Sequence, residues 1–166
     1  MKYTLGFSAG FHDAAVCLLS HHGEIEFAAH SERYSKIKND PNLHPDLIRE
    51  LYGYDITDVA YYERPWLKQL RQCYSGQGIE WNKITLGQVV RQQLRPKILG
   101  DARFHCYNHH LSHAAGGFQT SEFDRATVVV IDAIGEWDTI SIWGAEYING
   151  RARYRKLWGQ RYPHSI

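Results

Sequence analysis

The sequence contains few cysteines and no long apolar run, and both features narrow the class of protein. Its 166 residues include three cysteines, Cys17, Cys73 and Cys106, without a C-x-x-C pair, which argues against a disulfide scaffold and for a reducing compartment. No stretch approaches the roughly 18 apolar residues that a membrane helix needs, and the first residues lack the apolar core of a signal peptide. We therefore expect a cytoplasmic protein without a membrane segment.

An excess of charge of either sign is also lacking. The formal net charge is +1 and the isoelectric point about 7.8, which gives no support for nucleic-acid binding. Near the C-terminal end, arginines at 151, 153 and 155 alternate with other residues, as expected of a strand with one solvated face. The sequence shows no repeat or low-complexity linker, and its composition is that of one globular domain.

Hydrophobic periodicity predicts an α/β protein. Three strands are expected over residues 3–8, 14–20 and 24–30, which would form an antiparallel meander. Further strands are expected over 56–63, 102–107, 127–131, 139–148 and 151–158, and the last two would pair across an Asn149-Gly150 turn. Helices are expected over 45–51, in the small-residue stretch after Ser112, and in a polar insertion near 66–100 that stops at Pro96. Glutamines and arginines in the insertion indicate a solvated helix rather than RNA contacts.

The motif Asn108-His109-His110-Leu111-Ser112-His113 is a candidate metal site. On a helix, His109 and His113 would share one face with Cβ atoms about 5–6 Å apart, a spacing that lets two imidazoles bind one ion. Asp132 follows an apolar strand, at the kind of strand end where open α/β sheets place their sites, and would be the third ligand. This set suits iron(II), manganese or zinc. With ten histidines in the chain, such pairs also arise by chance.

Two turns are candidates for phosphate binding. Gly135, in the Asp132-x-x-Gly135-Glu136 turn, would let backbone N–H groups approach a phosphate. In the turn of residues 8–13, Ser8, Gly10 and the backbone amides could face phosphate, while His12 and Asp13 supply polar contacts. His12 could also transfer a proton, because an unperturbed imidazole titrates near neutral pH. Many hairpins carry such residues without a ligand.

Five segments together resemble the NodU/CmcH-type carbamoyltransferases. The likeness runs from end to end of the chain, and the histidine and aspartate blocks are its most specific part. The segments are Gly6-Phe7-Ser8-Ala9 with His12-Asp13-Ala14-Ala15, Glu32-Arg33-Tyr34-Ser35, His109-His110-Leu111-Ser112-His113-Ala114-Ala115, Asp132-Ala133-Ile134-Gly135-Glu136-Trp137 and the closing Tyr162-Pro163-His164-Ser165-Ile166.

The resemblance implies a fold and an activity. The fold would be an actin-like, Hsp70-type (ribonuclease H-like) half-domain with a mixed sheet, an antiparallel three-strand meander and packed helices, similar also to the universal tRNA threonylcarbamoyl transferases. Carbamoyl phosphate and ATP would give carbamoyl-adenylate in a separate YrdC-like domain, and the N-terminal domain would pass the carbamoyl group to a hydroxyl of a small molecule. The metal, iron(II) by resemblance, would be held by His109, His113, Asp132 and an aspartate from farther along.

One segment departs from the family pattern. Where the family carries Ala-Glu-Glu-Glu-Arg-Phe, this chain has Ala29-His30-Ser31-Glu32-Arg33-Tyr34. Only Glu32 and Arg33 are therefore expected to carry over, as substrate contacts. A guanidinium placed at a strand end, as Arg33 is predicted to be, recognises carboxylate or phosphate in a bidentate way.

The resemblance assigns residues 1–166 to the N-terminal lobe of a carbamoyltransferase N-terminal domain. The rest of that domain and the YrdC-like domain would have to be supplied in cis or by a separate chain, and the lobe alone is expected to be inactive. Two alternatives stay open: a non-catalytic actin-like module that binds metal or nucleotide, and a different transfer or hydrolysis reaction at the same site. The sequence does not identify the carbamoyl acceptor.

Overall fold

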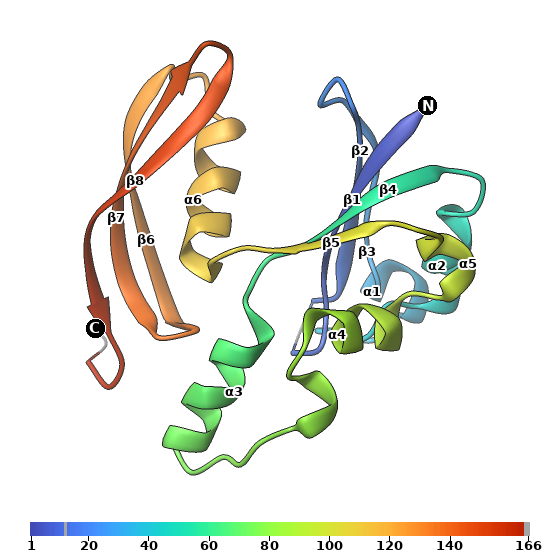
Figure 1. Cartoon of the computed structure of the whole chain (residues 1–166), viewed down its shortest axis with the longest axis horizontal. Coiled ribbons are helices and arrows are strands. Elements are labelled where there is room, and N and C mark those ends of the chain that lie inside the picture. The colour runs from blue at the N-terminus through green and yellow to red at the C-terminus, as the bar shows by residue number, and fades with distance from the viewer. Residues whose placement is uncertain (12, 165–166) are drawn as a thin grey trace. The chain divides into compact units, whose positions relative to one another are not determined.

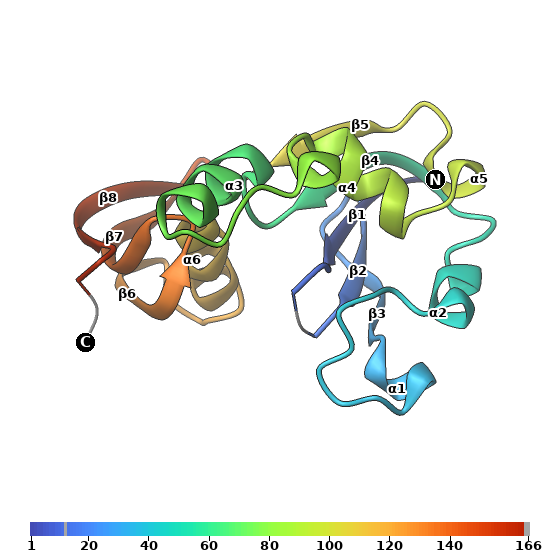
Figure 2. The ribbon, with the colours of Figure 1, turned by 90° about the horizontal axis from the view of Figure 1, so that it is seen from below.

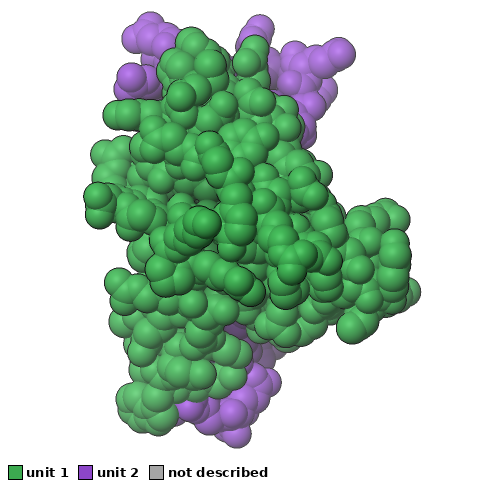
Figure 3. All heavy atoms as spheres, turned by 90° about the vertical axis from the view of Figure 1, so that its right-hand side faces the viewer, with its two compact units in different colours: residues 1–66, 80–106 green, residues 67–79, 107–166 purple. Residues whose placement is uncertain are grey.

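The computed structural model describes residues 1–11 and 13–164, so His12 lies outside the described residues. The chain divides into two compact units, which Figure 3 distinguishes by colour. The first comprises residues 1–66 and 80–106, and the second comprises residues 67–79 and 107–166. None of the helices in the described part of the chain has the length and hydrophobicity required to span a bilayer.

The first unit is built on a five-stranded mixed sheet (Figure 1). Its strands are β1 (Lys2–Ser8), β2 (Ala15–Ser20), β3 (Ile25–His30), β4 (Asp55–Tyr61) and β5 (Arg103–Cys106), in the order β3-β2-β1-β4-β5. The first three strands pair antiparallel, while β4 runs parallel to β1 and β5 parallel to β4. This arrangement confirms the predicted α/β class, with its antiparallel meander inside a mixed sheet.

The core of the first unit lies on one face of this sheet. Alternate strand residues such as Leu5, Leu18 and Val59 are fully buried, because successive side chains of a strand point to opposite faces. Three helices contribute apolar side chains to the same cluster: α2 (Pro45–Glu50), α4 (Leu86–Gln93) and α5 (Pro96–Leu99). Figure 2 shows the same unit from below. A short helix, α1 (Glu32–Ser35), follows β3.

The segment predicted as a helical insertion contains α3 (Pro65–Tyr74), the 3₁₀ turn η1 (Trp81–Lys83), α4 and α5. A capping box at Thr85 and Gln88 begins α4. Helix α4 ends at Gln93, ahead of Pro96, but the helices do not stop there as predicted, because Pro96 is the first residue of α5. A first-turn N–H has no partner within a helix, so proline costs nothing there.

The second unit is a three-stranded antiparallel sheet covered on one face by helix α6 (His109–Gln119). Its strands are β6 (Arg125–Gly135), β7 (Asp138–Ile148) and β8 (Arg151–Arg161), and Figure 1 shows α6 lying along them. Ala114 of α6 packs against Val130 and Trp143 of the sheet. Asn149 and Gly150 both have positive φ, at 51° and 71°, which confirms the predicted two-residue hairpin.

We expect Asp58 to make the stability of the first unit depend on pH. Its carboxylate accepts hydrogen bonds from Arg103 (2.9 Å) and lies 2.8 Å from His105 Nε2, and these contacts hold its pKa well below the usual value. A carboxyl group with a lowered pKa contributes stability above its unfolded-state pKa, near 4, and that contribution is lost as the pH falls. As the pH falls from about 6 to about 3, urea unfolding should therefore show a smaller loss of stability for Asp58→Asn than for the original chain.

Asp55→Asn is the matched control for this prediction, because Asp55 is an exposed acid on the same strand. Its unfolding should keep the acid dependence of the original chain. Equal pH dependence in Asp58→Asn and in the original chain would show that the contacts of Asp58 with Arg103 and His105 do not stabilise the fold.

Candidate metal centre

Helix α6 begins at an asparagine cap that places the histidines in its first turns. Asn108 has extended backbone angles, and its Oδ1 accepts a hydrogen bond from the backbone N–H of Leu111 at 2.9 Å. Such a cap satisfies one of the N–H groups that a helix start leaves without a partner. His109 is consequently the first residue of the helix, and His113 follows one turn later on the same face.

The structure brings the three predicted metal ligands together within the second unit. His109 Nε2 lies 2.9 Å from Asp132 Oδ2 and 3.0 Å from His113 Nε2, while His113 Nε2 lies 3.9 Å from the same oxygen. One ligand atom from each of the three residues falls within 4.8 Å of the others. The side chain of His109 is 13% exposed and that of His113 is 56% exposed, so the group opens to solvent on the His113 side.

The electrostatics of this group fit a divalent cation. Partial burial lowers the pKa of His113, the neighbouring His109 lowers it further, and Asp132 acts in the opposite direction. A lowered pKa keeps this imidazole neutral at neutral pH, which is the form that binds metals. Two imidazole nitrogens and one carboxylate oxygen match the donor set of iron(II), manganese and zinc sites.

The sequence predicted that Asp132 stands at the end of its strand, and this prediction is wrong. Strand β6 continues to Gly135, but its pairing with β7 is interrupted between Ile131 and Gly135. Ile131 pairs with Ile140 and Gly135 with Asp138, so three residues of β6 face a single residue of β7. Extra residues of this kind bend a strand and change the direction of side chains, often beside functional sites. Asp132 lies in this irregular stretch and reaches His109 from there.

Gly135 makes room for the histidine helix. A Cβ atom at this position would lie 2.5 Å from His109 Cδ2 and 2.7 Å from His110 Cδ2, distances that side chains do not tolerate. The positive φ of the turn, 57°, belongs to Glu136. The absence of a side chain at Gly135 thus allows close packing of two segments. A phosphate contact at Gly135 or Glu136 stays a prediction.

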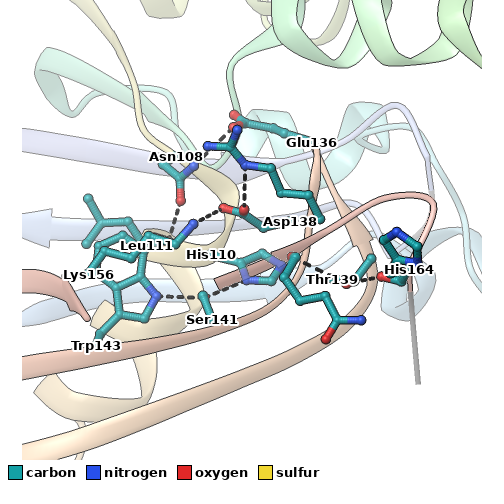
Figure 4. Close-up of polar contacts among 12 residues, drawn as sticks. Asn108, His110, Leu111, Glu136, Asp138, Thr139, Ser141, Trp143, Lys156 and His164 are labelled. Carbon is teal, nitrogen blue, oxygen red and sulfur yellow. Dashed lines mark hydrogen bonds and ion pairs between the residues drawn. The ribbon is translucent and has the colours of Figure 1, made fainter. Parts of the chain in front are cut away.

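His110 is a residue whose role the sequence interpretation missed. It is fully buried, and Figure 4 shows its ring beside Ser141, with Nδ1 2.7 Å from Ser141 Oγ. The same hydroxyl oxygen accepts a hydrogen bond from Trp143 Nε1 at 2.7 Å. Burial lowers the pKa of His110. Its spacing from Ala114 and Phe118, four and eight residues on, could have indicated that it faces the sheet.

In the first unit, the turn predicted to bind phosphate is held by the surrounding backbone. Ser8 Oγ donates a hydrogen bond to the carbonyl of Asp13 at 3.2 Å, and the N–H of Gly10 donates to the carbonyl of Pro41 at 2.7 Å. Ser8 also borders a cavity of about 390 Å³ that is lined in part by Cys17 and His30. Phosphate contacts by Ser8, Gly10 and Asp13 stay predictions, and His12 lies outside the described residues.

The predicted substrate contacts lie in helix α1. Arg33 was expected at a strand end, but β3 stops at His30 and Arg33 is an exposed residue of α1. The backbone N–H of Asn39 donates to Glu32 Oε2 at 3.4 Å, so this carboxylate is joined to the loop that follows. Substrate binding by Glu32 and Arg33 stays a prediction.

The fold and the site define an α/β protein with a cluster of two histidines and one aspartate that could hold a metal ion. Residues 75–166, more than half of the chain, match the model of the family described as carbamoyltransferase N-terminus. The chain belongs to this carbamoyltransferase family, as its resemblance predicted.

Two relatives are much longer than this chain. The uncharacterized protein sll1178 of Synechocystis sp. (strain ATCC 27184 / PCC 6803 / Kazusa) is 29% identical over 193 residues, which cover 100% of this chain and 30% of that protein. The nodulation protein NolNO of Sinorhizobium fredii (strain NBRC 101917 / NGR234) is 28% identical over 138 residues, covering 76% of this chain and 20% of NolNO. The chain thus spans less than a third of the length of these relatives.

Two solved structures are distantly similar. A Pseudomonas aeruginosa protein described as uncharacterized, with similarity to peptidase YEAZ, has 13% identity and a TM-score of 0.48, covering 98% of this chain and 67% of that chain. YeaZ from Pseudomonas aeruginosa has 15% identity and a TM-score of 0.44, covering 98% of this chain and 68% of that chain. Both scores are too low to bear on the fold.

Proposed function

We propose that this chain is the metal-binding N-terminal part of an O-carbamoyltransferase that acts in the cytoplasm. The observation that carries the proposal is the convergence of His109, His113 and Asp132, with ligand atoms within 4.8 Å of one another, in a chain that belongs to a carbamoyltransferase family. The substrates would be carbamoyl phosphate, ATP and a small molecule with a hydroxyl group. Cys17, Cys73 and Cys106 are all free thiols, which agrees with a reducing compartment.

His109, His113 and Asp132 would hold one divalent cation, with iron(II) preferred by resemblance and manganese or zinc as alternatives. When bound, the cation would polarise phosphate or carbamoyl oxygens and offset the charge of the leaving adenylate. His109 Nε2 and Asp132 Oδ2 lie 2.9 Å apart, so the chain already brings two donor atoms close together, and both would turn toward the cation when it binds.

The other predicted site residues would bind and orient the substrates. Backbone N–H groups of the Ser8–Asp13 and Asp132–Glu136 turns would contact phosphate oxygens, because amides of such turns attract anions. Arg33 would pair with an anionic group of the substrate, and His12 would take the proton of the acceptor hydroxyl. The remaining part of the enzyme would be supplied in cis or by a separate chain. In its absence the site would bind metal without turnover.

Mass spectrometry of candidate acceptors tests the activity. We expect a product that carries one added carbamoyl group when the acceptor is incubated with ATP, carbamoyl phosphate, metal and this chain reconstituted with the rest of the enzyme. Omission of this chain should abolish the product. A reconstituted, metal-loaded enzyme that modifies no antibiotic, sugar or nucleoside hydroxyl would favour the non-catalytic module instead.

A further inference from the structure

A partly buried hydrogen bond joins the start of the histidine helix to the hairpin between β6 and β7. Asn108 Nδ2 donates to Glu136 Oε2 at 3.1 Å, while Asn108 Oδ1 caps the helix at Leu111. Figure 4 shows Asn108 between Leu111 and Glu136. Glu136 is only 3% exposed, so its carboxylate is largely removed from water. We call the Asn108–Glu136 hydrogen bond the clasp.

The backbone conformation of Glu136 indicates that its carboxylate has a structural role in addition to forming the turn. Its φ of 57° lies in the left-handed region, which is unfavourable for an L-residue other than glycine. Glycine or asparagine is the usual occupant of such a hairpin position. A buried glutamate at a strained position indicates that its side chain makes a contact that glycine could not make.

The clasp connects the two segments that supply the metal ligands. Asn108 directly precedes His109, and Glu136 follows Asp132 by four residues on the hairpin. Between these points, the His109 ring packs over the bare Cα of Gly135. Neither Asn108 nor Glu136 belongs to the group of converging ligand atoms. A change in the clasp would therefore act on the separation of His109 from Asp132 without removing a ligand.

We propose that Asn108 and Glu136 are positioning residues that set the separation of His109 and Asp132 for metal binding. The inference rests on the proposed function, because it assumes that these residues hold a cation. Partners that orient metal ligands typically change metal affinity about 10–100-fold when they are mutated, and we expect a loss in this range when the clasp is broken.

Cobalt(II) titration of the full 166-residue chain, followed by its visible absorption, tests the proposal. Asn108→Ser keeps an N-cap oxygen but removes the amide donor, so cobalt should bind about 10–100-fold more weakly with a shifted absorption band. Glu136→Gly removes the acceptor and also relieves the strained backbone, so its loss of affinity should not be accompanied by a lower melting temperature. Glu136→Gln keeps an acceptor oxygen and should bind cobalt nearly as the original chain does.

The possible results distinguish a failure of the clasp proposal from a failure of the proposed metal site. Cobalt binding by the original chain, with equal affinity and absorption in Glu136→Gly, would overturn the clasp and leave the metal site intact. Equal losses of cobalt affinity in Glu136→Gln and Glu136→Gly would also overturn the proposed role of the clasp, since the hydrogen bond would then be irrelevant to metal binding. An original chain that binds no cobalt would overturn the metal site and the clasp together. Because Glu136→Gly relieves strain, it decides the question even if Asn108→Ser does not fold.

Discussion

Replacing His109 or His113 by alanine is expected to abolish the binding of one divalent cation. Each change removes one of three ligand atoms that lie within 4.8 Å of one another. Loss of a direct ligand should weaken binding by more than the roughly 100-fold that the loss of an orienting partner can cause. Elemental analysis of the purified chain, alone and with the rest of the enzyme, measures the metal content directly.

His22→Ala is the matched control for this experiment. His22 is an exposed histidine in the turn between β2 and β3, where its ring lies tilted against that of His21 with centroids 3.7 Å apart. Its removal should leave the metal content unchanged, which separates a loss of ligands from a general loss of histidine. If both His109→Ala and His113→Ala retain the metal, the site assignment is wrong.

Features of short range could be predicted from the sequence. The meander follows from apolar residues that recur with the period of a strand, and Asn149-Gly150 specifies its hairpin because both residues accept positive φ. The pairing of His109 with His113 follows from helical spacing alone. Asp132 could be predicted as the third ligand because an apolar strand precedes it, even though that strand continues farther than predicted.

Features that depend on register and on contacts between segments could not be predicted. The interruption of the pairing of β6 with β7 after Ile131 depends on how the two strands align, and no local sequence pattern predicts it. The same holds for Gly135, whose sequence context suggested a phosphate turn although its missing side chain makes room for two histidine rings. The link between Asn108 and Glu136 spans 28 positions, so it becomes visible only when the helix lies on the hairpin.

Gly135→Ala is expected to destabilise the second unit and to impair metal binding at once. The added Cβ would lie 2.5 Å from His109 Cδ2 and 2.7 Å from His110 Cδ2. Neither ring can move freely, because His109 contacts Asp132 at 2.9 Å and His110 contacts Ser141 at 2.7 Å. Overpacking of this kind typically costs about 1–3 kcal/mol, and the displaced His109 would no longer meet Asp132.

Two glycines of the same unit provide matched controls for Gly135→Ala. A Cβ at Gly144 in β7 would lie 3.8 Å from Leu157, an ordinary contact, and a Cβ at Gly116 in α6 would meet nothing within 4 Å. Gly144→Ala should leave the melting temperature nearly unchanged, while Gly116→Ala should raise it, because alanine is favoured over glycine in a helix by about 1 kcal/mol. Melting curves and cobalt titrations of the three variants measure both effects. A Gly135→Ala chain that melts and binds cobalt like Gly144→Ala would show that the helix and the hairpin do not need their close approach.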